Sequence, residues 1–289
     1  MGLPASGAIS LNDVNVELGN TATAQIDMNS AAFRGLFGIG SGAISMSDGY
    51  GKSSQFSFSI TSNVNNANLA TLATNAGWDG SAELIATIEP NVYCNSTHYL
   101  AYGMIITGSF PGGVTLINNG YIVGRGGNGG KGATSSNATG GGTGGTALVI
   151  QSSVSIYNYG TIAGGGGGGG GGNSTYWSDK GSGGYAQGGG GGGGASGLTA
   201  SLGNTYGPSQ GGGNNTYGNG ALGQWTTGGY GRAGTGGRGG TRGAAGLSGV
   251  KSSGNISLAI GPGGGGGLAT SGQSNVTWLA TGTRLGGLG

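Results

Sequence analysis

Alternation between hydrophobic and polar residues predicts two strands in the first half of the chain. Apolar side chains alternate with serine over residues 56–60, and the same two-residue period returns over residues 84–88, just before a proline. Between these segments, residues 66–76 carry leucines at helical spacing and are followed by Gly77, a residue type that commonly ends helices. The pattern therefore predicts a small α+β domain over residues 53–118.

A short motif occurs twice in the first fifty residues. Residues 6–13 read SGAISLND, and residues 41–48 read SGAISMSD. In each copy a serine, Ser10 or Ser45, stands three positions before an aspartate, which is the pattern of a capping box at the start of a helix. Helices this short are not stable alone, so we expect residues 1–52 to form a docking module.

A longer repeat has a period of forty residues. Residues 114–127 align without gaps with residues 154–167, and residues 255–264 form a third, shortened copy. In each copy a short β-like segment leads into a glycine run. Repeats of this length are typical of stacked architectures, in which each unit buries one face on the next.

Glycine dominates the second half of the chain. Of the 289 residues 79 are glycine, and 64 of these lie in residues 119–289; ordinary proteins contain roughly 7 % glycine. A run such as residues 164–172 is either a flexible linker or a polyglycine-II helix, which has three residues per turn and must hydrogen-bond to neighbouring helices. The recurrence of the runs, with aromatic residues between them, favours a bundle of such helices. The strict Gly-X-Y period of collagen is absent.

The repeat also predicts which segments share an end of this bundle. The segments expected at the tip are residues 133–139, 173–187 and 214–227. The segments expected at the base are residues 146–163, 195–210 and 250–260. Aromatic residues on loops held by a rigid scaffold are typical of binding surfaces. The residues that we predict to form such a surface are Tyr176, Trp177, Asp179, Lys180, Tyr185, Asn214, Asn215, Tyr217 and Trp225. In the competing interpretation, the tryptophans cover the ends of the bundle.

Charge divides the chain at the same place as glycine. Residues 1–118 contain seven acidic and two basic residues, whereas residues 119–289 contain eight basic residues and one acidic residue, Asp179. A basic half indicates an anionic partner such as lipopolysaccharide phosphate, acidic glycan or nucleic acid. Alternatively, the sparse basic residues keep a glycine-rich surface soluble.

The composition argues against an enzyme. The chain has one cysteine, Cys94, and one histidine, His98, so no cysteine-based zinc site and no cluster of histidines is available. These two residues are either a reactive pair or half of a metal site, or else ordinary residues at the edge of a strand. We expect no catalytic residues, no metal site and no cofactor. No apolar run reaches the length of a membrane helix, and the N-terminus has no secretory signal pattern.

Several segments resemble known phage proteins. Residues 3–19 and 41–51 resemble N-terminal segments of tailed-phage tail-tip and tail-fibre proteins. Residues 118–127, the glycine runs and residues 276–284 resemble glycine-rich phage receptor-binding proteins, including the distal adhesins of T-even-like phages. This resemblance implies a sandwich of polyglycine-II helices whose variable tip loops contact a bacterial receptor.

Together these features predict a phage adhesin at the distal end of the tail or tail fibre. The expected fold is mostly irregular and β, with a docking module (1–52), an α+β domain (53–118) and a polyglycine-II receptor-binding domain with short strands (119–289). Its expected partners are a bacterial surface protein or glycan and other tail proteins, with no nucleic acid and no membrane insertion. The alternative functions are a structural component of the tail tip and a glycine-rich surface-layer protein.

Overall fold

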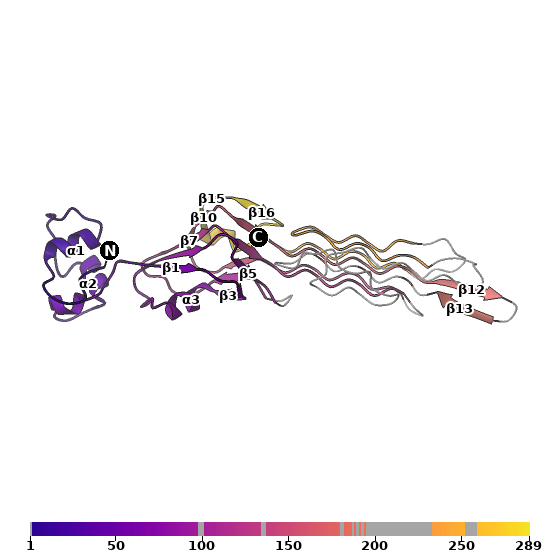
Figure 1. Cartoon of the computed structure of the whole chain (residues 1–289), viewed down its shortest axis with the longest axis horizontal. Coiled ribbons are helices and arrows are strands. Elements are labelled where there is room, and N and C mark those ends of the chain that lie inside the picture. Colours follow the sequence, from indigo (N-terminus) through magenta and orange to yellow (C-terminus); the bar gives the residue numbers. More distant parts are fainter. Residues whose placement is uncertain are drawn as a thin grey trace.

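The chain forms an elongated molecule with three successive parts (Figure 1). A computed structural model describes residues 2–97, 101–133, 137–179, 182–186, 188, 191, 194, 233–251 and 259–289. A small helical module lies at one end, a body of parallel strands follows, and long segments without regular helix or strand lead to a hairpin at the other end. Strands outnumber helices in the described part, as the sequence predicts.

The N-terminal module contains three short helical elements. They are α1 (Leu11–Glu17), α2 (Ala31–Phe37) and the 3-10 helix η1 (Met46–Gly49). Both predicted capping boxes are confirmed: the backbone N–H of Asp13 donates to Ser10 Oγ at 3.2 Å, while Ser10 N–H donates to Asp13 Oδ2 at 2.8 Å, and the Ser45 pair repeats the arrangement. These short helices are stabilised by their own small core, in which the rings of Phe33 and Phe37 stack 4.4 Å apart.

The body is a coil whose successive turns add one parallel strand to each sheet. The first sheet contains, in spatial order, β1 (Gln55–Ile60), β4 (Glu83–Ile88), β7 (Val114–Asn118), β10 (Val154–Asn158) and β15 (Val276–Ala280). The second contains β16 (Thr283–Leu285), β11 (Thr161–Ala163), β8 (Tyr121–Val123), β5 (Tyr93–Asn95) and β2 (Val64–Asn65). The third contains β14 (Thr270–Ser271), β9 (Leu148–Ile150), β6 (Met104–Ile106) and β3 (Ala67–Asn68). Helix α3 (Leu69–Asn75) follows β3 and is capped by Asn68.

The forty-residue repeat is the spacing between two turns of this coil. Leu116 pairs with Ile156 in the first sheet, and Ile122 pairs with Ile162 in the second. All four side chains are fully buried in the core of the body. The predicted stacking of repeats is therefore confirmed for these two copies.

The structure differs from two expectations, one about the third copy of the repeat and one about the domain boundary at residue 118. β10 lies between β7 and β15, so the strand that follows it in the sheet does not come from the third copy, residues 255–264. Residues 255–258 of that copy lie outside the described residues. The predicted boundary at residue 118 falls inside the body, because all three sheets take strands from both sides of it. Parallel neighbours need long connections, so a single body collects strands from residue 55 to residue 285.

The glycine-rich segments are two excursions from the coil. The first leaves after β8 and returns at β9, and the second leaves after β11 and returns at β14. Within the described residues, the central run (residues 164–173) is surrounded by six other segments that hydrogen-bond to it or lie against its backbone. Each of these segments hydrogen-bonds to the next in the following order: residues 188, 191 and 194, then 124–133, 137–145, 259–267, 244–251 and 233–243.

Hydrogen bonds along the central run repeat every third residue. The N–H groups of Gly165, Gly168 and Gly171 donate to carbonyl groups of segment 137–145 at 2.9, 2.8 and 3.0 Å. The carbonyl groups of residues 166, 169 and 172 accept N–H groups of segment 124–133 at 2.8, 2.8 and 2.9 Å. The backbone of the run is thus hydrogen-bonded on several sides, and residues 164–172, all glycine, have no side chains to contribute.

Of the segments predicted to lie at the base of the glycine bundle, one is placed there by the structure and another is not. Residues 146–163 lie in the coil, as expected for the base. Residues 250–251 and 259–260 were also expected there, but Val250 donates to Thr235 at 2.8 Å and Gly261 donates to Gly171, near the hairpin end. The chain makes an additional reversal at Thr241–Ala244, which no signal in the repeat indicated. Residues 195–210 and 214–227 lie outside the described residues.

Candidate binding surfaces

The described residues contain no arrangement suited to metal or thiol chemistry. Within them, no three His, Cys, Asp or Glu side chains come together. Cys94 is buried in the core of the body, and this burial raises the pKa of its thiol to about 12. Its predicted neighbour His98 lies outside the described residues, so the pair is not tested. Among the helices of the described part, none has the length and apolar character needed to cross a membrane.

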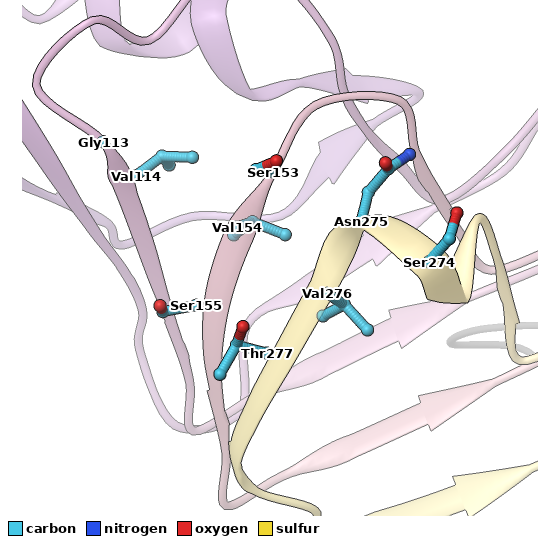
Figure 2. Close-up of a pocket in the computed structure, with 9 residues that line it drawn as sticks. All are labelled: Gly113, Val114, Ser153, Val154, Ser155, Ser274, Asn275, Val276 and Thr277. Carbon is cyan, nitrogen blue, oxygen red and sulfur yellow. The ribbon is translucent and has the colours of Figure 1, made fainter.

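A cavity of about 280 Å³ lies where β7, β10 and β15 begin (Figure 2). Its lining residues are Gly113, Val114, Ser153, Val154, Ser155, Ser274, Asn275, Val276 and Thr277. The Asn275 side chain already donates to the carbonyl of Ile150 at 3.1 Å. None of these described lining side chains is ionisable, so they supply no general acid or base.

The hairpin at the far end of the molecule carries four of the predicted surface residues. It consists of β12 (Thr175–Asp179) and β13 (Ser182–Ala186), which pair antiparallel (Figure 1). The register places Tyr176 opposite Tyr185, Trp177 opposite Gly184 and Asp179 opposite Ser182. The sequence predicted a loop here and missed the hairpin. The other predicted residues, Lys180, Asn214, Asn215, Tyr217 and Trp225, lie outside the described residues.

The stem of this hairpin is embedded in the glycine segments. Asn173 and Ser174, which directly precede β12, are completely buried. The carbonyl of Asn173 accepts the N–H of Gly234 at 2.9 Å, and Ala133 donates to Gly172 at 2.9 Å. On the return side, Gly188 donates to Ala133 at 2.8 Å. The backbone just before β12 and the backbone just after β13 are therefore both held by neighbouring segments.

A second surface feature was not predicted. A groove of about 490 Å³ lies between segments 124–133 and 137–145. Its lining residues are Arg125, Gly126, Gly127, Asn128, Gly142, Thr143 and Gly144. The signal that could have found it is the three-residue spacing of Arg125, Asn128 and Lys131 among glycines, since residues three apart share a face of a helix with three residues per turn.

The Glu17 carboxylate of the N-terminal module contacts the first residues of the body. Glu17, at the end of α1, accepts the hydroxyl of Ser53 at 2.9 Å and the backbone N–H of Ser54 at 2.8 Å. The Ser54 hydroxyl also donates to the carbonyl of Glu17 at 2.6 Å. The connection between module and body is therefore held by several short polar contacts.

Comparisons with known proteins agree with this arrangement. A family model described as phage tail fibre adhesin Gp38 matches residues 55–289. Among solved structures, the chain is similar to the crystal structure of the gp37–gp38 adhesin tip complex of the bacteriophage S16 long tail fibre. The identity is 24 % and the TM-score 0.54, over 98 % of this chain and 99 % of that chain, so this likeness concerns the fold. No curated protein matches.

The family match extends over both the coil and the glycine-rich excursions. It begins at the first residue of β1 and continues to the end of the chain, and so leaves out the N-terminal module. The match spans well over half of the sequence and includes the hairpin at the far end. The chain therefore belongs to the phage tail fibre adhesin Gp38 family.

Proposed function

We propose that this adhesin binds a bacterial outer-membrane protein or surface glycan through the end of the molecule that carries the β12–β13 hairpin. The observation that carries the proposal is the position of this hairpin, at the end opposite the N-terminal module (Figure 1). Its stem is fixed by backbone hydrogen bonds, which reduces the ordering cost of association. Residues Tyr176, Trp177, Asp179 and Tyr185 then belong to the receptor surface, together with Lys180, Asn214, Asn215, Tyr217 and Trp225.

The scaffold of this surface is a bundle of polyglycine-II helices. Three observations support this: hydrogen bonds repeat every three residues, six segments surround the central run within the described residues, and the run has no room for side chains. A Cβ atom added to any residue from Gly164 to Gly172 would lie 1.8 to 2.3 Å from a carbonyl oxygen of a neighbouring segment. Such close approach of backbones is the property that polyglycine helices require.

Residues 1–52 attach the adhesin to another tail-fibre protein. This module has a hydrophobic core of its own, separate from that of the body, and it lies outside the family match. The similar solved structure is a complex of two tail-fibre proteins, gp37 and gp38, which is the kind of partner proposed here. The adhesin then occupies the distal end of a tail fibre and acts by binding alone, without a cofactor and without catalysis.

The experiment that tests this function replaces the hairpin. Residues 175–186 are exchanged for a Gly-Asn-Gly turn in the full chain, and adsorption to susceptible bacteria is measured with the fluorescently labelled protein. We expect loss of adsorption with an unchanged melting temperature, because the segments that hold the stem remain. A matched control, Tyr159→Ala, removes an aromatic side chain that is 64 % exposed in the body and should adsorb normally. Normal adsorption of the hairpin replacement would place the receptor surface elsewhere.

A further inference from the structure

The groove between segments 124–133 and 137–145 has the dimensions of a small-ligand site. Its volume of about 490 Å³ falls in the range of pockets that hold small molecules, about 300 to 1,000 Å³. Of the seven lining residues within the described part of the chain, four are glycines, so peptide groups and Cα methylenes form much of the groove surface. Arg125, Asn128 and Thr143 supply the side chains at its margins.

Arg125 is held in place at this groove. Its Nη1 donates to the carbonyl of Thr97 at 2.8 Å, which ties the guanidinium to the body. Its Nε is buried and has no hydrogen-bond partner within the described part of the chain. A guanidinium has five N–H donors, so the contact with Thr97 leaves donors for a ligand. An arginine that is oriented in advance loses little freedom when it binds an anion.

The charge on this face favours an anionic ligand. Asn128 and Lys131 follow Arg125 at intervals of three residues and are exposed. From residue 119 to the end of the sequence the single acidic residue is Asp179, which lies on the hairpin. Segments 124–133 and 137–145 contain no Asp or Glu, so neither segment supplies a carboxylate that would neutralise Arg125.

We propose that this groove binds an anionic saccharide, a sugar that carries a phosphate or a carboxylate. The anionic group pairs with Arg125, the sugar ring lies over the glycine surface, and Asn128 and Thr143 hydrogen-bond its hydroxyl groups. Among the described residues that line the groove none is aromatic, which disfavours nucleic acid because single-stranded bases bind by stacking on aromatic side chains. This site is separate from the hairpin surface and goes beyond the receptor binding proposed above.

The first part of the test measures ligand binding to the full chain by saturation-transfer NMR and calorimetry. The probes are glucose 1-phosphate, galacturonic acid, the neutral methyl α-glucopyranoside and inorganic phosphate. We expect one or both anionic sugars to bind at least about tenfold more tightly than the neutral sugar and inorganic phosphate, the scale of one charged hydrogen bond. The tighter of the two identifies phosphate or carboxylate as the preferred group. Binding of neither anionic sugar, or equal binding of the neutral sugar or of inorganic phosphate, would overturn the proposal.

The second part uses matched variants at Thr143, which lies in the groove and is exposed. Thr143→Glu places a negative charge at the margin, whereas Thr143→Gln adds similar volume without charge. We expect the glutamate variant to bind the anionic sugar at least about tenfold more weakly than the glutamine variant, because both variants lose the threonine hydroxyl and differ from each other in charge. Equal affinity of the two variants contradicts the proposal, and neither change removes a contact of Arg125.

The third part separates this site from the hairpin surface. Arg125→Gln should weaken sugar binding and Arg125→Lys should restore part of it, with melting temperatures measured for both. Arg238→Gln, in a segment on the other side of the central run, should bind the sugar normally. Trp177→Ala should also keep sugar binding even where it abolishes adsorption to cells. Loss of sugar binding in the Trp177 or Arg238 variant would place the site outside the groove.

Discussion

Asn118 and Asn158 lie forty residues apart in the sequence and meet in the core of the body, where Asn118 Nδ2 donates to Asn158 Oδ1 at 2.7 Å. Both side chains are buried. Asn118 Oδ1 accepts the N–H of Gly120 at 3.1 Å, and Asn158 Nδ2 donates to the carbonyl of Thr281 at 2.8 Å. The pair thus joins three successive turns of the coil at the corner after the first sheet.

Removal of one amide from this pair should destabilise the body. Asn118→Leu leaves the N–H of Gly120 and Oδ1 of Asn158 buried without these partners, which costs about 2 to 3 kcal/mol. The free energy of unfolding, measured by urea denaturation, should fall by this amount. The control Asn65→Leu changes an exposed asparagine of β2 and should alter it by less than about 0.5 kcal/mol. Equal effects of the two substitutions would show that the amide pair contributes nothing specific.

Alanine at Gly168 should disrupt the glycine segments. Its Cβ would lie 1.9 Å from the carbonyl oxygen of Asn128, so the backbones must separate at a cost of about 3 kcal/mol or more. The matched control is Gly265→Ala, whose Cβ would meet Thr143 Cγ2 at an ordinary 3.7 Å. We expect rapid proteolysis of the first variant and parental resistance in the second. Parental resistance of both would contradict a packed bundle.

Deletion of residues 1–52 should separate attachment from adhesion. The truncated protein keeps the core of the body and the hairpin, so we expect it to adsorb to bacteria. It should no longer assemble into virions, as measured by immunoblotting of purified particles. Trp177→Ala is the reciprocal control and should still assemble. If the truncated protein assembles but fails to adsorb, the polarity of the molecule is the reverse of that proposed.

Trp177→Ala should weaken receptor binding by about 2 kcal/mol, the scale of an aromatic hot spot. Its melting temperature should stay close to that of the parent, because the neighbouring glycine segments hold the stem. Tyr157→Ala should instead lower the melting temperature and leave the receptor affinity of the folded protein unchanged, since Tyr157 lies on β10 in the body. Adsorption isotherms and melting curves measured in parallel distinguish the two effects. If the Trp177 variant melts at a lower temperature but binds normally when folded, this tryptophan covers the end of the bundle and does not contact the receptor.

Cys94 should be unreactive in the folded protein. Burial raises the pKa of its thiol to about 12, so almost no thiolate is present at pH 8, and thiolate is the reactive form. We expect slow alkylation by iodoacetamide without denaturant and fast alkylation in urea, where the pKa returns to about 8.5. Mass spectrometry of the quenched samples measures both rates. Fast alkylation under native conditions would show that this part of the coil opens.

Local signals in the sequence determined the local structure. The capping boxes of Ser10 and Ser45 act on backbone groups three residues away, so their helices could be placed from the sequence. The forty-residue repeat likewise predicted that residues 114–123 stack on residues 154–163, because identical patterns of buried residues pair in register. The concentration of glycine indicated segments that are packed through their backbones.

The tertiary structure alone decided how these elements combine. β10 pairs with β15 across more than a hundred residues. This pairing has no local signal, because the crossover between parallel strands can be a dozen residues or many more. The same holds for the reversal at Thr241–Ala244, which reassigns residues 250–251 to the hairpin end, and for the groove beside Arg125. Each depends on which segments lie next to each other in space. Glycine has no side chain, so a run of glycines carries no sequence pattern that indicates which segments pack against it.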